Sequence, residues 1–89
     1  MEPIFKASYM LNTINVSVYP DRIVYQTGIA HLKKEEIILI NQIADVEIVS
    51  IMNEVKIRTT GGREYKLIVK GADKEKVRDI ILQRQQSIK

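Results

Sequence analysis

Residues 54–70 read EVKIRTTGGREYKLIVK and contain two stretches in which apolar and charged side chains alternate. Alternation with a period of two is typical of strands that are buried on one face only. Placing every apolar side chain on one face requires Ile57 opposite Tyr65, because a slip of one residue would set Ile57 against Lys66. This register predicts an odd-numbered loop, most simply Thr60–Gly62, with Gly62 as a glycine at positive φ.

The period changes after Gly71, and residues 73–86 are predicted to form a helix. Its apolar stripe follows the helical spacing and consists of Val77, Ile80, Ile81, Arg84 and Ile88. Asp73 is the expected N-cap, and Arg84 near the end of the helix suits the helix dipole. We expect this helix to close one end of a β structure.

The upstream half is predicted to consist of strands. Residues 1–12 form either a lead-in or a short first strand, and this choice stays open. A turn at Tyr19–Arg22 joins two strands, which places Ile23 and Tyr25 on the same face as Val18 and Val16. After a loop at Gly28–Lys34, the apolar run in Glu35–Ile40 suggests a strand that is buried on both faces or covered along one edge. The next strand runs from Ile43 to near Ile51.

These elements amount to six or seven strands and one C-terminal helix in a single domain, residues 1–89. The strands occupy residues 13–70, apart from the open first one. The chain has no cysteine and no apolar run of membrane-spanning length, so a soluble cytoplasmic protein is the default expectation.

Charge is distributed unevenly along the chain. Residues 1–53 carry 4 basic and 6 acidic side chains, and residues 54–89 carry 10 basic and 5 acidic ones. The two halves therefore have net charges of −2 and +5, which favours contact of the second half with something anionic.

The residues needed for catalysis or metal binding do not occur together. There is one histidine, His31, in a predicted loop, and Gly61–Gly62 joins two strands instead of preceding a helix as in a phosphate-binding loop. Glu35 and Glu36 are adjacent and point to opposite faces of a strand. We expect a protein that is not an enzyme and has no cofactor and no metal.

Three segments in order resemble the bacterial pleckstrin-homology-like (PH-like) domains. They are INVSVYPDRIVY at 14–25, EIILINQIADV at 36–46 and VKIRTTGGREY at 55–65. The resemblance implies a bent antiparallel barrel of six or seven strands that is capped by the terminal helix, but not one function, since this fold binds lipids, peptides and proteins. Two features depart from the family. The turn at Tyr19–Arg22 is short and offers only Arg22 to a phosphoinositide, and Ile80 or Ile81 stands where relatives have tryptophan.

Three functions compete. The first is binding of a protein or peptide partner, including self-association as a homo-oligomer. The second is contact with an anionic membrane surface through the apolar loop residues Ile29 and Leu32 and the cations Lys33 and Lys34. Two apolar side chains offer little area, so this contact is expected to be weak and to disappear in salt. The third and least favoured is weak nucleic-acid binding through Lys56, Arg58 and Lys66, which no exposed aromatic side chains interleave.

Overall fold

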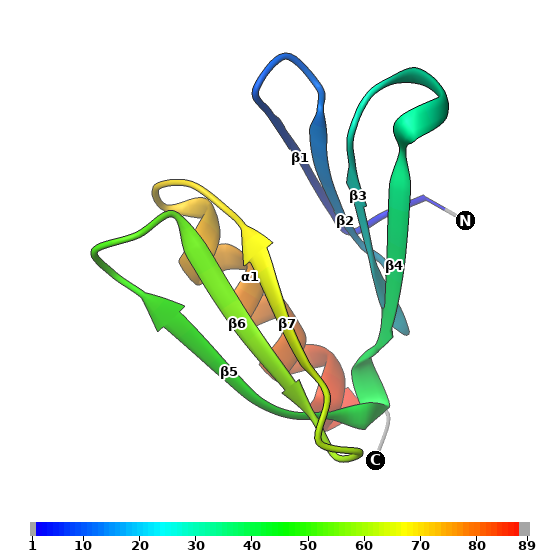
Figure 1. Cartoon of the computed structure of the whole chain (residues 1–89). Coiled ribbons are helices and arrows are strands. Elements are labelled where there is room, and N and C mark those ends of the chain that lie inside the picture. The colour runs from blue at the N-terminus through cyan, green and yellow to red at the C-terminus, as the bar shows by residue number, and fades with distance from the viewer. Residues whose placement is uncertain (1, 88–89) are drawn as a thin grey trace.

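The computed structural model describes residues 2–87 and contains two antiparallel sheets and one C-terminal helix (Figure 1). The first sheet has the order β1 (Phe5–Tyr9), β2 (Ile14–Val18), β3 (Arg22–Thr27) and β4 (Lys34–Leu39). The second has the order β5 (Ile43–Val49), β6 (Glu54–Thr59) and β7 (Glu64–Ile68), followed by α1 (Asp73–Ser87). Short 3-10 turns, η1 (Ala30–Leu32) and η2 (Ile40–Gln42), flank β4. The predicted mainly β class is confirmed. Within residues 2–87, no strand of one sheet pairs with a strand of the other, so these strands do not close into one hydrogen-bonded barrel.

Both predicted hairpin registers are confirmed. In the second sheet Ile57 lies opposite Tyr65, and Gly62 has φ 86° in the loop between β6 and β7. That loop is closed by the Thr59 N–H, which donates to Arg63 O at 2.9 Å. In the first sheet Val18 lies opposite Ile23 and Val16 opposite Tyr25. Alternation of apolar residues was sufficient in both hairpins because each directs its apolar side chains to one face.

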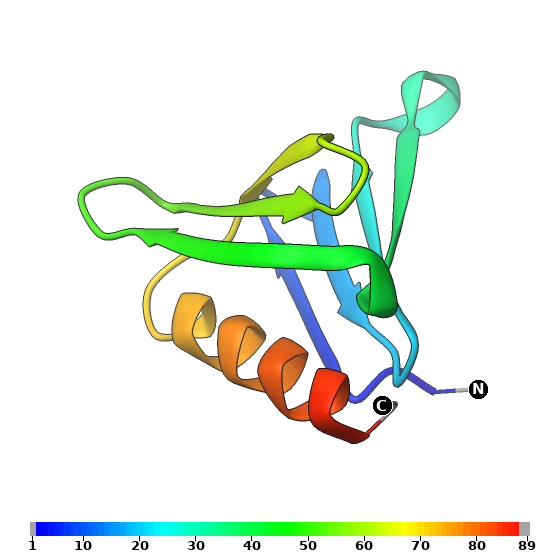
Figure 2. The same ribbon diagram turned by 90° about the horizontal axis from the view of Figure 1, so that it is seen from below.

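The core lies between the two sheets and is completed by α1. Val77 and Ile81 are fully buried, and Ile80 packs against the same cluster, as the helical spacing predicted. Figure 2 shows α1 along the open side between β1 and β5. Arg84 Nε donates to Pro20 O at 3.1 Å, which fixes the end of the helix against the turn between β2 and β3. Ile88, which belonged to the predicted stripe, lies outside the described residues.

Asp73 is not the N-cap of α1, and this prediction was wrong. The carbonyl of Ala72 accepts the bond from the Lys76 N–H at 3.3 Å, so Ala72 is the cap and Asp73 is the first helical residue. The Asp73 carboxylate instead accepts a hydrogen bond from Tyr9 Oη at 2.9 Å. This contact ties the start of the helix to β1.

Three other strands resolve, correct or refine the sequence interpretation. The open question at residues 4–10 is answered by β1, which forms a full edge strand along β2. The expectation that the apolar run in β4 is buried on both faces or covered was wrong, because Ile37 and Leu39 are 51% and 41% exposed. Finally, β5 ends at Val49, and Ile51 stands exposed in the turn that follows. Alternating exposure in β4 means that this strand buries only the face that carries Ile38.

A tyrosine links the two sheets directly. The Thr59 N–H donates to Arg63 O, and the Val69 N–H donates to Asn53 O. Because bonding alternates along an antiparallel pair, the N–H groups of the odd-numbered residues of β7 point toward β6. The Ile68 N–H therefore points away from β6 to the free side of β7. There it donates to Tyr25 Oη at 3.0 Å. Burial raises the pKa of Tyr25, as expected for a phenol inside the core.

Candidate interaction surfaces

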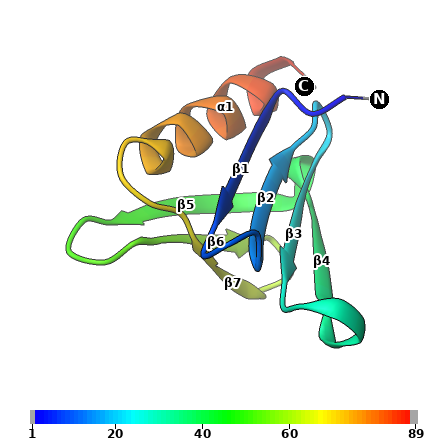
Figure 3. The same ribbon diagram turned by 90° about the horizontal axis from the view of Figure 1, so that it is seen from above.

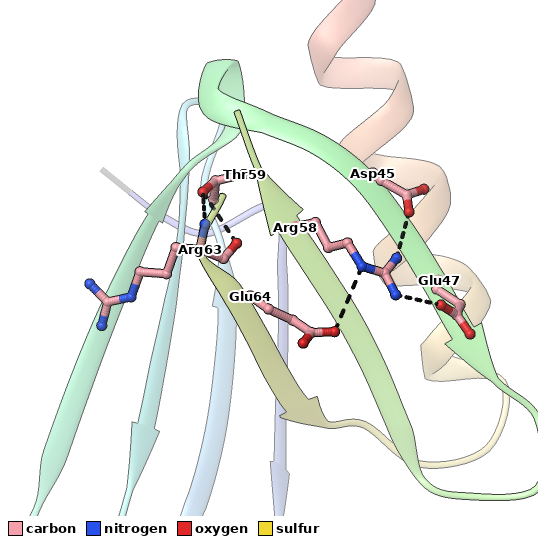
Figure 4. A network of polar contacts seen from close by, with 6 residues as sticks. All are labelled: Asp45, Glu47, Arg58, Thr59, Arg63 and Glu64. Carbon is pink, nitrogen blue, oxygen red and sulfur yellow. Dashed lines mark hydrogen bonds and ion pairs between the residues drawn. The ribbon is translucent and has the colours of Figure 1, made fainter. Parts of the chain in front are cut away.

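The outer face of the second sheet carries a network of ion pairs centred on Arg58 (Figure 4). Arg58 on β6 donates to Asp45 at 2.6 Å and to Glu47 at 3.0 Å, both on β5, and lies 3.7 Å from Glu64 on β7. The hydrogen bonds to Glu47 and Asp45 raise the pKa of Arg58 further above its usual range. Arg58 was one of the cations predicted to contact an anionic partner, but it is already bound by carboxylates on both neighbouring strands.

Lys56 and Lys66 face each other across β6 and β7, as the register predicts, and Lys56 also lies opposite Glu47 on β5. The same face carries four carboxylates and three cations, which are Asp45, Glu47, Glu54 and Glu64 against Lys56, Arg58 and Lys66. The positive half of the chain is therefore not a positive surface here, because β5 from the acidic half lies beside it. This pairing was not visible in the sequence, since the register of β5 on β6 shifts between Ile43 and Asp45.

The free edge of β4 presents unpaired main-chain groups. The Ile40 N–H donates to Asp21 O at 2.9 Å, which continues the ladder of β3 and β4. Alternation from that bond directs the N–H and C=O groups of Glu35, Ile37 and Leu39 away from β3. No described strand pairs with this side of β4. The edge therefore offers a row of donors and acceptors to an added strand.

Apolar side chains adjoin this edge on the outer face of the first sheet. Ile37 lies opposite the half-buried Val24, and Leu39 lies opposite Arg22. The row beyond Ile37 is polar and internally bonded, with Gln26 Nε2 donating to Glu35 at 2.9 Å. An apolar patch beside an exposed edge is typical of surfaces that bind another chain.

The loop residues Ile29 and Leu32 lie at one end of the first sheet, and both are exposed. The structure brings two further apolar residues to that end, Met10 and Leu11 in the loop between β1 and β2 (Figure 1). The Gly28 N–H donates to Thr13 O at 2.9 Å and joins the bases of the two loops. We call Met10, Leu11, Ile29 and Leu32 the loop tip. Sequence reasoning missed Met10 and Leu11 because their segment has weak periodicity, although the polar pair Asn12-Thr13 after them is a turn signal.

Both loops of the tip have specific backbone conformations. Met10, Leu11 and Asn12 have φ values of 52°, 55° and 66°, a left-handed run that costs roughly 1–2 kcal/mol per residue. Thr13 Oγ1 donates to Met10 O at 2.7 Å, and Asn15 Nδ2 donates to Asn12 O at 2.9 Å. These side-chain bonds hold the strained turn, so Leu11 is kept 98% exposed by an ordered loop.

The second loop depends on a glycine. Gly28 has φ 98°, and a Cβ on it would lie 2.5 Å from Leu32 O. Only glycine fits this approach, which closes the loop around η1 and leaves Leu32 71% exposed. Lys33 and Lys34 follow directly and are exposed. The tip and its two cations are therefore positioned by turns that the sequence encodes locally.

His31 and Tyr9 have different surroundings. His31 is exposed in η1, and within residues 2–87 no three metal-binding side chains of histidine, aspartate or glutamate gather. Burial and the bond to Asp73 raise the pKa of Tyr9 to about 12, which makes its hydroxyl a donor instead of a base. The helix of the described chain is too short and too polar to cross a bilayer. Comparison with models of known protein families and with curated proteins finds no match to this chain.

Proposed function

We propose that this chain is a non-catalytic PH-like interaction module whose β4 edge binds an extended segment of another protein. The PH-like assignment is supported by the order of elements, with four antiparallel strands, then three, then a helix that covers their open side (Figure 3). It is also supported by the three sequence segments that resemble the family, which fall on β2–β3, β4–β5 and β6–β7. A bent barrel of this family is the finer description that we propose for the two packed sheets.

The exposed β4 edge is the observation that carries the proposal. It combines free main-chain groups on Glu35, Ile37 and Leu39 with two exposed apolar side chains. An extended segment added to such an edge gains main-chain hydrogen bonds, and alternate side chains give specificity. The matching segment has apolar residues opposite Ile37 and Leu39 and a lysine or arginine opposite Glu35.

The other sheet edges are less open. β1 and β5 flank α1 (Figure 2), and the Ile68 N–H on the free side of β7 is already bonded to Tyr25. The outer face of the second sheet is also a poorer candidate for nucleic acid, because the carboxylates that bond Arg58 would repel phosphates. A partner that avoids both obstacles approaches from β4.

Proline at Ile37 tests the edge with little disturbance of the fold. The Ile37 N–H has no partner on β3 in this register, so Ile37→Pro removes a donor from the edge and no ladder bond. Ile37→Thr is the matched control, since it keeps the amide and the β-branched shape while removing apolar area. A library of random ten-residue peptides displayed on phage is selected against the wild-type protein, and enriched peptides are then measured against both variants.

We expect enriched peptides with alternating apolar residues that bind wild type, bind Ile37→Thr less tightly, and do not bind Ile37→Pro. Bound peptide should shift the amide resonances of Glu35, Ile37 and Leu39. Concentration-dependent dimerisation in sedimentation that disappears in Ile37→Pro would identify a second copy as the partner at the same edge. Peptides that bind Ile37→Pro as well as wild type, or that shift resonances of α1 instead, would refute the proposal.

A further inference from the structure

The loop tip is separate from the β4 edge and has a different chemistry. Its four large apolar side chains are all exposed and come from two loops that share one hydrogen bond at their bases. Apolar residues scattered singly on a surface need no explanation, but a group at the end of a sheet does. The left-handed turn at residues 10–12 adds a second indication, since such strain is typical of functional sites.

The two loop segments that form the tip carry charges of one sign. Residues 10–13 and 28–34 contain no aspartate or glutamate, and they end in Lys33 and Lys34. The first carboxylate after them, on Glu35, is held along the sheet by its bond to Gln26. A surface that complements the tip therefore has negative charge on the outside and an apolar layer beneath it. An anionic lipid bilayer has this layering over its whole area.

We propose that the loop tip inserts into the interface of anionic bilayers while Lys33 and Lys34 contact the headgroups. Arg22 takes no part in this contact, because the turn at Tyr19–Arg22 lies at the opposite end of β2 and β3 from the tip, and Arg22 is paired with Asp21 at 3.0 Å. Met10 and Leu11 change the expectation from sequence. Four apolar side chains in place of two add a component of binding that salt does not screen.

The test measures flotation of the full chain with vesicles of phosphatidylcholine, with or without phosphatidylglycerol. Electrostatic attraction is screened at about 1 M salt, where the Debye length is about 3 Å, and apolar insertion is not. The apolar variant is Leu11→Asn with Leu32→Ser; asparagine tolerates a left-handed backbone, so the turn is retained. Ile51→Ser is the matched control, since Ile51 is 93% exposed in the loop between β5 and β6, outside the tip. Lys33→Gln with Lys34→Gln isolates the electrostatic part.

Wild type should float with anionic vesicles at low salt and keep part of that binding at about 1 M salt. The apolar variant should lose the salt-resistant part, with partitioning reduced roughly tenfold, about 1.4 kcal/mol. The Ile51→Ser control should behave like wild type, and the lysine variant should lose mainly the salt-sensitive part.

Three outcomes would overturn the proposal. In the first, wild-type binding disappears in high salt, or the apolar variant binds in high salt as well as wild type does. Either result would mean that the apolar side chains of the tip do not contribute. In the second, phosphoinositides are strongly preferred over phosphatidylglycerol at equal charge, which would mean headgroup recognition. In the third, the tip variant alters sedimentation without altering flotation, which would make the tip a contact between proteins. None of these results bears on peptide binding at β4, so the two proposals fail independently.

Discussion

Replacing Tyr25 by phenylalanine removes one oxygen from the core and breaks the hydrogen bond that links the two sheets. The ring of Tyr25 is buried and can stay in place, so packing is retained. The Ile68 N–H, which donates to Tyr25 Oη at 3.0 Å, is then left without its partner on the free side of β7. An unsatisfied buried donor costs about 1–3 kcal/mol, and partial exposure of Ile68 favours the lower half of that range. We therefore expect a loss of about 1–2 kcal/mol in the free energy of unfolding.

Urea denaturation followed by circular dichroism measures this loss, and amide hydrogen exchange locates it. The Ile68 amide should be protected in wild type and exchange much faster in Tyr25→Phe. The Lys66 amide, which points to the same edge of β7, is the internal comparison and should exchange rapidly in both proteins. In a domain of this size each 1 kcal/mol also lowers Tm by about 4–8 °C.

Tyr65→Phe is the matched control. The Tyr65 ring packs under the Arg63 guanidinium at 4.8 Å, a contact that phenylalanine keeps. Its effect should stay within about 0.5 kcal/mol. Equal losses in the two variants, or unchanged protection of the Ile68 amide in Tyr25→Phe, would refute the link between the sheets.

Three further predictions concern the hairpin, the helix and pH. Gly62→Val should destabilise by roughly 1–2 kcal/mol, because valine disfavours φ 86°, whereas Thr60→Val in the same loop should have little effect in urea melts. Ile81→Ala should cost roughly 2–5 kcal/mol by leaving a cavity under α1, and a loss below 1 kcal/mol would mean that the helix is not packed as described. The raised pKa of Tyr9, about 12 against 10.0, means that the folded state holds its proton more tightly; this stability is present below pH 10 and is lost as the pH rises from 10 to 12. Tyr9→Phe should therefore flatten the fall of the urea midpoint over that range, and an unchanged slope would contradict the assignment.

The parts of the fold that the sequence predicts are those encoded by local patterns. In the hairpin of β6 and β7 the alternation, the glycine and the loop parity all require one register, and the structure has that register. The buried stripe of Val77 and Ile81 follows from helical spacing in the same way. Each of these features depends only on residues within about one turn or one hairpin of each other.

The features that were missed depend on which elements become neighbours. The apolar run Ile37–Ile40 is compatible with a central strand, and only the sheet order places it at an edge. The ion pairs of Arg58 could not be predicted from the sequence, because Asp45 and Glu47 come from β5. The register shift in β5 determines which residues of β6 they lie opposite. Leu11 joins Ile29 only because the loops of two separate hairpins share one end of a sheet. The sequence therefore predicts the individual loops and strands of the candidate surfaces, but not which of them lie side by side.

The sheet order also has a consequence for how the chain folds. Every pair of hydrogen-bonded strands is adjacent in sequence, so each ladder forms with a short loop to close and a small entropic cost. The contacts with the largest separation involve α1, such as Tyr9 with Asp73 and Arg84 with Pro20. Topology of this kind favours early hairpins and late docking of the helix. Substitutions under α1 should then act mainly on the unfolding arm of a chevron plot, so α1 would set how long the folded state persists more than how fast it forms.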